Sequence, residues 1–139
     1  GIHDMAVRFS KCCSPVPGDE IVGFISKGQG VKVHRKDCPN IIREQRLINV
    51  YWDESAESKT YEANLLICAN DRNYLISDIV TIVSQCKVRL IGINSHVQND
   101  RITAVIKLTV EVHSLEHLRV LIANVKKLNS ITAVERVLS

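Results

Sequence analysis

The segment YEANLLICA at residues 61–69 alternates its side chains with a period of two. Such alternation is typical of a β-strand with one buried face. Beyond it, apolar residues recur at helical spacing over 75–83 and predict a helix that ends near Cys86. Residues 89–97 and 102–112 alternate again, so they predict two further strands.

The rest of the C-terminal part completes a regular order. Ser114 is a favourable N-cap, and the apolar stripe that follows it predicts a second helix ending at Asn129. Residues 131–138 predict a last strand. The order is βαββαβ, and each helix has one apolar stripe, so both helices should cover the same face of a four-stranded antiparallel sheet. The sequence therefore predicts an α+β fold in which a small Cys/His hairpin module precedes a ferredoxin-like sandwich over 61–139.

Charge divides the chain into two parts. The 139 residues suffice for one ordinary domain or two small ones. The net charge of +3 arises entirely in residues 1–47, where eight Lys and Arg face five acids, and residues 48–139 are balanced. We therefore expect a basic module over 1–53, joined to the sandwich by a polar linker at 54–60.

Several classes of protein are excluded by what the sequence lacks. No apolar run approaches the roughly 18 residues needed to span a bilayer. Five cysteines is an odd number, and no export signal accompanies them, so we expect a reducing cytoplasm rather than a disulfide framework. A phosphate-cradling Gly-Lys loop and a carboxylate constellation for phosphoryl transfer are both missing, so we expect no catalysis by these residues. The predicted strand at 102–112 has no aromatic residue on which RNA bases could stack, which argues against RNA recognition by this sheet.

The N-terminal module contains four candidate metal ligands, namely Cys12, Cys13, His34 and Cys38. Zinc prefers four thiolate or imidazole ligands, and one turn can bring His34 and Cys38 inward together. Against zinc, Cys12 and Cys13 are adjacent, and neighbouring side chains of an extended chain point apart. Two interpretations stay open: a zinc site, or a metal-free fold with small buried thiols. Catalysis by a Cys/His pair would need an orienting third group that the sequence does not specify.

Four basic residues lie on and beside a predicted hairpin, namely Lys27, Lys32, Arg35 and Lys36. Gly28 and Gly30 can supply the positive φ values that such a hairpin loop requires. We expect the four to form a basic edge. Basic edges are usually solvated surface, but this one could also follow RNA phosphates.

The segment DRNYLISDI at 71–79, together with the following strand, resembles an ACT domain. ACT domains are small regulatory modules that often bind amino acids and pair side by side into larger sheets. The resemblance implies an amino-acid site in the loop formed by Asn70, Asp71, Arg72, Asn73, Tyr74 and Leu75. A helix N-terminus there attracts a carboxylate, and Leu75 with Ile76 would accept a branched-chain side chain. Tyr74 stands where the family commonly has Gly and would crowd the pocket, so an ACT module without a ligand is the alternative.

The N-terminal motifs carry a second resemblance. The segments CCSPVPGDEIVGF at 12–24, KGQGV at 27–31 and HRKDCPN at 34–40 resemble the C-terminal part of long RelA/SpoT-family proteins. These proteins are the guanosine penta/tetraphosphate synthetases and hydrolases, or GTP pyrophosphokinases, of the stringent response. In that family a zinc-finger or ribosome-intersubunit segment precedes a terminal ACT domain, and the catalytic domains lie upstream.

The second resemblance implies a function. It predicts a cytoplasmic, non-catalytic regulatory fragment whose basic module contacts ribosomal RNA and whose ACT domain senses amino acids. The fragment would control the catalytic domains in cis. The alternative function is a ligand-free dimerisation module, in which ACT sheets of two copies pair to form a homodimer.

Overall fold

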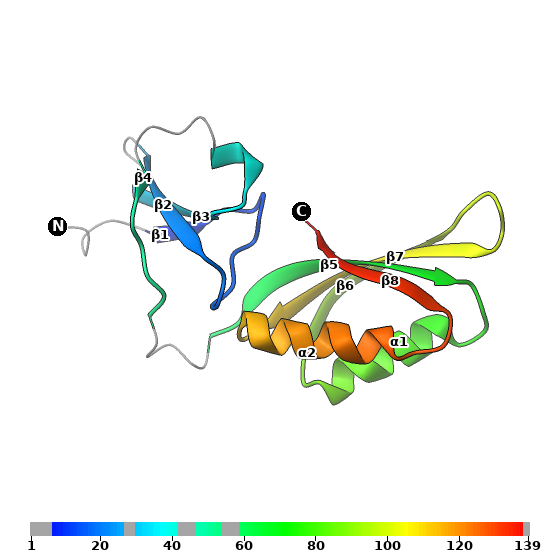
Figure 1. Ribbon diagram of the computed structural model, residues 1–139. Coiled ribbons are helices and arrows are strands. Elements are labelled where there is room, and N and C mark those ends of the chain that lie inside the picture. The colour runs from blue at the N-terminus through cyan, green and yellow to red at the C-terminus, as the bar shows by residue number, and fades with distance from the viewer. Residues whose placement is uncertain (1–6, 27–29, 42–46, 54–58, 138–139) are drawn as a thin grey trace.

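The computed structural model describes residues 7–26, 30–41, 47–53 and 59–137, which form two sheets (Figure 1). In chain order the elements are β1 (Val7–Phe9), β2 (Ile21–Ser26), β3 (Gly30–Arg35), the 3₁₀ turn η2 (Pro39–Ile41), β4 (Leu47–Ile48), β5 (Tyr61–Asn70), α1 (Leu75–Gln85), β6 (Arg89–Val97), β7 (Thr103–Val112), α2 (Leu115–Lys126) and β8 (Ile131–Val137). The N-terminal sheet has the strand order β1-β3-β2-β4, and the C-terminal sheet has the order β6-β7-β5-β8. None of the helices in the described ranges is long and apolar enough to cross a membrane.

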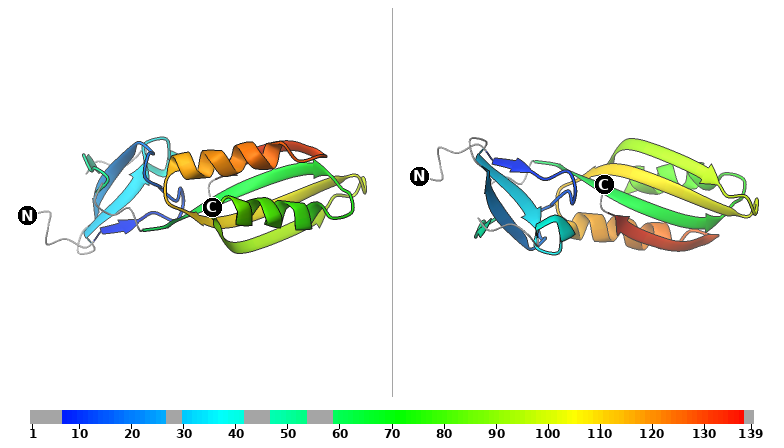
Figure 2. Two further views of the ribbon diagram at one scale, coloured as in Figure 1. Left: turned by 90° about the horizontal axis from the view of Figure 1, so that it is seen from below. Right: turned by 90° about the horizontal axis from the view of Figure 1, so that it is seen from above.

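The C-terminal domain has the predicted βαββαβ order, and both helices cover one face of its antiparallel sheet (Figures 1 and 2). Side chains from the sheet and the helices meet in one hydrophobic core. Its largest fully buried members include Leu65, Ile67, Ile79, Ile106, Leu108, Leu118 and Leu121. Each such side chain contributes roughly 1.5–3 kcal/mol by leaving water, so aliphatic burial is the main source of stability here.

The two helices begin in different ways. The Ser114 side chain accepts the backbone N–H of His117 at 3.1 Å and so caps α2, as its sequence predicts. Helix α1 begins after Tyr74, which has the left-handed φ of 66° and forms no side-chain cap. Helix α2 ends at Lys126, three residues before the predicted end at Asn129.

The N-terminal sheet is only partly as the sequence predicts. The β2–β3 hairpin is present, with Ser26 paired to Gly30, although its tip at 27–29 lies outside the described residues. Strand β4 is limited to Leu47–Ile48, and Val50 and Trp52 beyond it pack on the small core. Strand β1 runs parallel to β3 and was not foreseen, since three residues are too few to show a period.

The two domains are docked rather than merely tethered. Val16 belongs to the N-terminal chain segment, yet it is fully buried in the hydrophobic core of the C-terminal domain. Phe9 stacks on Trp52 with ring centroids 5.5 Å apart, and both rings meet Tyr61 of β5 edge-on. The N-terminal domain keeps a separate small core of Ile21, Val31 and Val33. The two domains therefore also contact each other through side chains outside the segment that joins them.

Candidate metal centre

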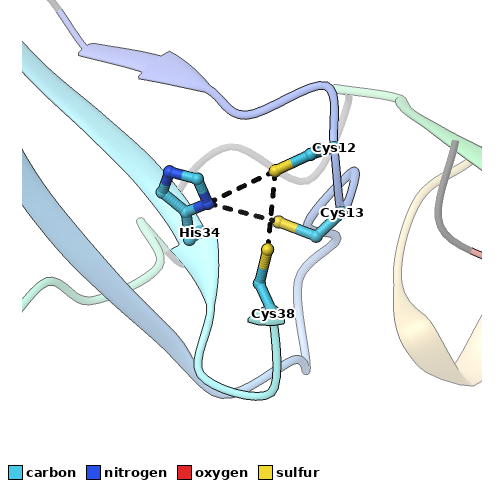
Figure 3. Close-up of side chains that lie close together, drawn as sticks. All are labelled: Cys12, Cys13, His34 and Cys38. Carbon is cyan, nitrogen blue, oxygen red and sulfur yellow. Dashed lines mark hydrogen bonds between the residues drawn. The ribbon is translucent and has the colours of Figure 1, made fainter. Parts of the chain in front are cut away.

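Three separate pieces of the N-terminal domain supply the candidate metal ligands (Figure 3). Cys12 and Cys13 lie in the turn after β1, His34 is on β3, and Cys38 follows that strand in a second turn. Their ligand atoms all lie within 4.8 Å of one another. The structure therefore brings together the four residues that the sequence singles out.

The distances between these atoms fit a tetrahedral metal. The Cys12 Sγ lies 3.4 Å from the Cys38 Sγ and 3.5 Å from the His34 Nδ1, and the Cys13 Sγ lies 3.8 Å from the same nitrogen. Zinc bonds of about 2.3 Å to sulfur and about 2.0 Å to nitrogen place tetrahedral ligand atoms about 3.5–3.8 Å apart. These three separations lie close to that range, and no pair of ligand atoms is more than 4.8 Å apart, so small shifts of the side chains would complete a tetrahedral zinc site.

A tight turn explains how two adjacent cysteines converge. Ser14 has a φ of 46°, and its backbone N–H donates to the carbonyl of Ser10 at 3.0 Å. The chain at Cys12 and Cys13 is therefore turned rather than extended. This removes the geometric objection to a paired-cysteine site, which rested on the side-chain alternation of an extended chain.

Hydrogen bonds around the site hold two of the sulfurs. The Ser10 Oγ lies 2.7 Å from the Cys12 Sγ, and the backbone N–H of Arg35 donates to the Cys13 Sγ at 3.3 Å. Ser10 is only 2 % exposed. Sequence reasoning missed it, because a serine two residues before a cysteine carries no distinctive signal. Such supporting groups orient metal ligands and tune their charge.

The three thiols differ in acidity. Burial acts to raise the pKa of Cys12, but hydrogen bonds from Ser10, Asn40 and Cys38 outweigh it and lower this pKa to about 7. Burial raises the pKa of Cys13 to about 12 and raises that of Cys38 as well. Buried thiols bind metal as thiolates, so a metal ion at this site must displace protons.

Three residues of the predicted basic edge, namely Lys32, Arg35 and Lys36, are among those that the structure describes. Lys32 and Lys36 are exposed, and Lys27 lies outside the described residues. Arg35 is three residues from Lys32 on β3 and so points to the other face of the strand. Its guanidinium forms an ion pair with Asp37, with Nε 2.9 Å from the carboxylate, and this holds the pKa of Asp37 below its usual range.

The predicted amino-acid loop lines an open cavity of about 670 Å³ between the first turn of α1 and Ser95 of β6. Arg72 is already engaged, because it pairs with Asp78 at 2.9 Å and donates to the carbonyl of Asn129 at 3.1 Å. Tyr74 is 79 % exposed and contributes to the cavity wall. Its left-handed backbone explains physically why glycine suits this position.

Comparison with known families divides the chain as its two sheets do. Residues 1–53 match the RelA/SpoT RIS domain, and residues 57–136 match the ACT domain. In the solved structures, the ACT domain of GTP pyrophosphokinase from Chlorobium tepidum has a TM-score of 0.51 and 19 % identity, and covers 57 % of this chain and 100 % of that chain. At that identity the likeness supports the fold alone.

Several curated relatives match almost the whole chain. The GTP pyrophosphokinase of Haemophilus influenzae is 31 % identical over 98 % of this chain, and that of Escherichia coli K12 is 36 % identical over 84 %. The bifunctional (p)ppGpp synthase/hydrolase RelA of Mycobacterium tuberculosis is 34 % identical over the full chain. The matched regions make up 19 %, 16 % and 19 % of these three proteins, so the chain spans less than a fifth of their length.

Proposed function

Since the chain belongs to the ACT-domain family and is homologous, through its RIS and ACT domains, to the C-terminal region of RelA/SpoT GTP pyrophosphokinases, we propose that it acts as a regulatory part of such an enzyme. Its RIS and ACT domains are regulatory parts of that enzyme family rather than catalytic ones. In this proposal the RIS domain comprises residues 1–53, the linker 54–60, and the ACT domain 61–139. The two domains control catalytic domains that lie in cis.

The observation that carries the proposal is the cluster of Cys12, Cys13, His34 and Cys38. These side chains would hold a structural zinc ion, because four closely spaced thiol and imidazole ligands leave no open position for a reacting group. When bound, the metal would cross-link the turn after β1, strand β3 and the turn that follows β3. All five cysteines carry free thiols, which supports a reducing, cytoplasmic location.

For the RIS domain we propose binding to ribosomal RNA. The support is the excess of positive charge in the first third of the chain and the exposure of Lys32 and Lys36. Phosphate contacts release counterions, so the affinity should fall steeply as salt rises.

Ribosome co-sedimentation at several salt concentrations tests this directly. The triple variant with Lys27, Lys32 and Lys36 changed to Ala should bind more weakly and show a smaller salt slope. Lys127→Ala, an exposed lysine of the ACT domain, is the matched control and should leave binding unchanged. Equal binding of the triple variant and the wild type would refute the RNA proposal.

For the ACT domain we propose an amino-acid site in the cavity beside the loop of residues 70–75. The cavity is large enough to admit a small aliphatic amino acid, and Leu75 and Ile76 are among the residues that line it. Titration with Val, Ile and Leu, followed by calorimetry and thermal unfolding, tests the site. Heat of binding and a raised melting temperature at millimolar ligand support it, and their absence would leave an ACT domain without a ligand.

A second candidate function is dimerisation through the ACT sheet. Strands β6 and β8 are its two edges, so either can pair with the same edge of a second copy. Light scattering separates the two forms by mass, and a monomer at every accessible concentration would remove this candidate.

A further inference from the structure

The segment from Ser14 to Asp19, here called the clasp, joins the metal ligands to the ACT domain. Val16 is fully buried in the ACT core. The carbonyl of Pro17 accepts the backbone N–H of Leu115 at 2.7 Å. Gly18 has a φ of 108°, and a Cβ added to it would lie 2.9 Å from the Leu115 Cβ, so only glycine allows this close approach.

A buried ion pair closes the clasp. The Arg136 guanidinium, on β8, donates to both carboxylate oxygens of Asp19 at 2.7 and 2.8 Å and to the carbonyl of Ser14 at 2.9 Å. The Arg136 and Asp19 side chains are only 14 % and 7 % exposed. A bidentate ion pair with this little exposure fixes the orientation of both side chains.

The same segment is anchored on its other side to the RIS domain. Ser14 directly follows the candidate ligand Cys13. The carbonyl of Asp19 accepts the indole N–H of Trp52 at 3.0 Å, and the carbonyl of Glu20 accepts the backbone N–H of Lys36 at 2.8 Å. The clasp therefore has metal ligands at one end, RIS backbone at the other, and the ACT domain in contact with its middle.

We propose that a metal ion at Cys12, Cys13, His34 and Cys38 fixes the clasp and thereby docks the RIS domain on the ACT domain. This rests on the metal site of the proposed function. A free segment must lose conformational entropy when it docks, whereas a segment already held at Cys13 by the metal has lost much of it beforehand. Coupling of this kind is reciprocal, so docking must strengthen metal binding by the factor with which metal strengthens docking.

The amide of Leu115 is a natural reporter of the docked state. Leu115 is the first residue of α2, and the first amides of a helix have no acceptor within the helix. Its protection from hydrogen exchange depends on the carbonyl of Pro17. The amide of Ile106, in the middle of β7, reports the ACT core independently.

The experiment compares amide exchange in the zinc-loaded chain and after chelation. We expect the protection of Leu115 to fall about tenfold or more on chelation, while Ile106 keeps its protection. Cys38→Ser should produce the same loss at Leu115 without touching the clasp. Cys68→Ser, which changes a cysteine of the ACT sheet, is the matched control and should have no effect.

The converse experiment measures zinc affinity after the clasp is broken. Arg136→Met should weaken zinc binding about tenfold, although Arg136 forms its hydrogen bonds with Asp19 and Ser14, neither of which is a metal ligand. Arg119→Met, at an exposed position of α2, should leave the affinity unchanged.

The outcomes distinguish the two claims. A chain that takes up no zinc would overturn the metal site and this inference together. A chain that binds zinc, but protects Leu115 equally before and after chelation, would overturn the coupling alone.

Discussion

The ACT and RIS domains reach stability by different means. Among the residues that the structure describes, the hydrophobic cluster of the ACT core has seventeen buried residues of the ACT domain together with Val16 of the RIS domain, whereas the RIS cluster has three. A domain with so small a core cannot offset the entropy of folding by burial alone. In the proposed function two supports outside this core would make up the difference, namely a metal ion at the Cys/His cluster and the surface of the ACT domain.

Metal removal should have the strongest effect, which is on the amide protection of the RIS sheet. Chelation should abolish the amide protection of β2 and β3, because structural zinc contributes on the order of 10 kcal/mol to the folding of small domains. The ACT sheet should stay protected under the same conditions, since its core needs no metal. Hydrogen exchange followed by NMR measures both in one sample, and a RIS sheet that survives chelation unchanged would remove the contrast between the domains.

Truncation of a buried core side chain should instead destabilise the ACT domain. Leu108 is fully buried in β7, so Leu108→Ala should lower the free energy of unfolding by about 3 kcal/mol through lost burial and a residual cavity. Ile102 is 61 % exposed, and Ile102→Ala should change stability by less than about 0.5 kcal/mol. Urea denaturation monitored by circular dichroism compares the two. If the two variants lose equal stability, burial of the core does not stabilise the ACT domain.

The variant Tyr74→Gly tests whether the left-handed backbone at the start of the ACT helix α1 is strained. The substitution relieves about 1 kcal/mol of left-handed backbone strain in the folded chain. It also raises the conformational entropy of the unfolded chain by a similar free energy, so the net change in the free energy of unfolding should be below about 0.5 kcal/mol. Ala123→Gly, at an exposed position of α2, should cost about 1 kcal/mol, because its helical backbone gains nothing from glycine. A loss at Tyr74→Gly as large as that at Ala123→Gly, measured by urea denaturation, would show that the strain is absent.

The smallest effect concerns pH and the turn between β6 and β7. The backbone N–H groups of Thr103 and Ile102 donate to Asp100 and hold the pKa of its carboxyl below the usual value. The pKa of Asp100 in the folded chain is therefore lower than its pKa in the unfolded chain, which is near 3.9. The carboxylate therefore stabilises the turn above that value, and the contribution is lost as pH falls through the folded pKa. NMR titration should show Thr103 and Ile102 shifting together in this range, and Asp100→Asn should abolish the shift.

The ACT sandwich could be predicted from the sequence because its strands and helices have clear periods of two and 3.6. Leu65 and Ile67 alternate on β5, and Leu118, Leu121 and Val125 form one stripe on α2. The family comparison and the two-helix architecture confirm this part of the prediction. Periodic burial is local information, so it is visible in a single sequence.

The RIS domain was harder, because its structure depends on contacts between distant residues. The left-handed turn at Ser14 determines that Cys12 and Cys13 converge, and nothing in the sequence marks a serine for positive φ. The pair of Asp19 and Arg136 joins residues 117 positions apart, and charge counting cannot select it among many acids and bases. The role of Val16 in the ACT core was missed for the same reason.

In the proposed function the RIS domain folds around a metal ion. Elemental analysis of the purified chain, beside Cys38→Ser, tests it most directly. We expect one zinc per wild-type chain and a zinc content near zero in the variant. Wild-type protein that folds with its RIS sheet protected and contains no metal would contradict it.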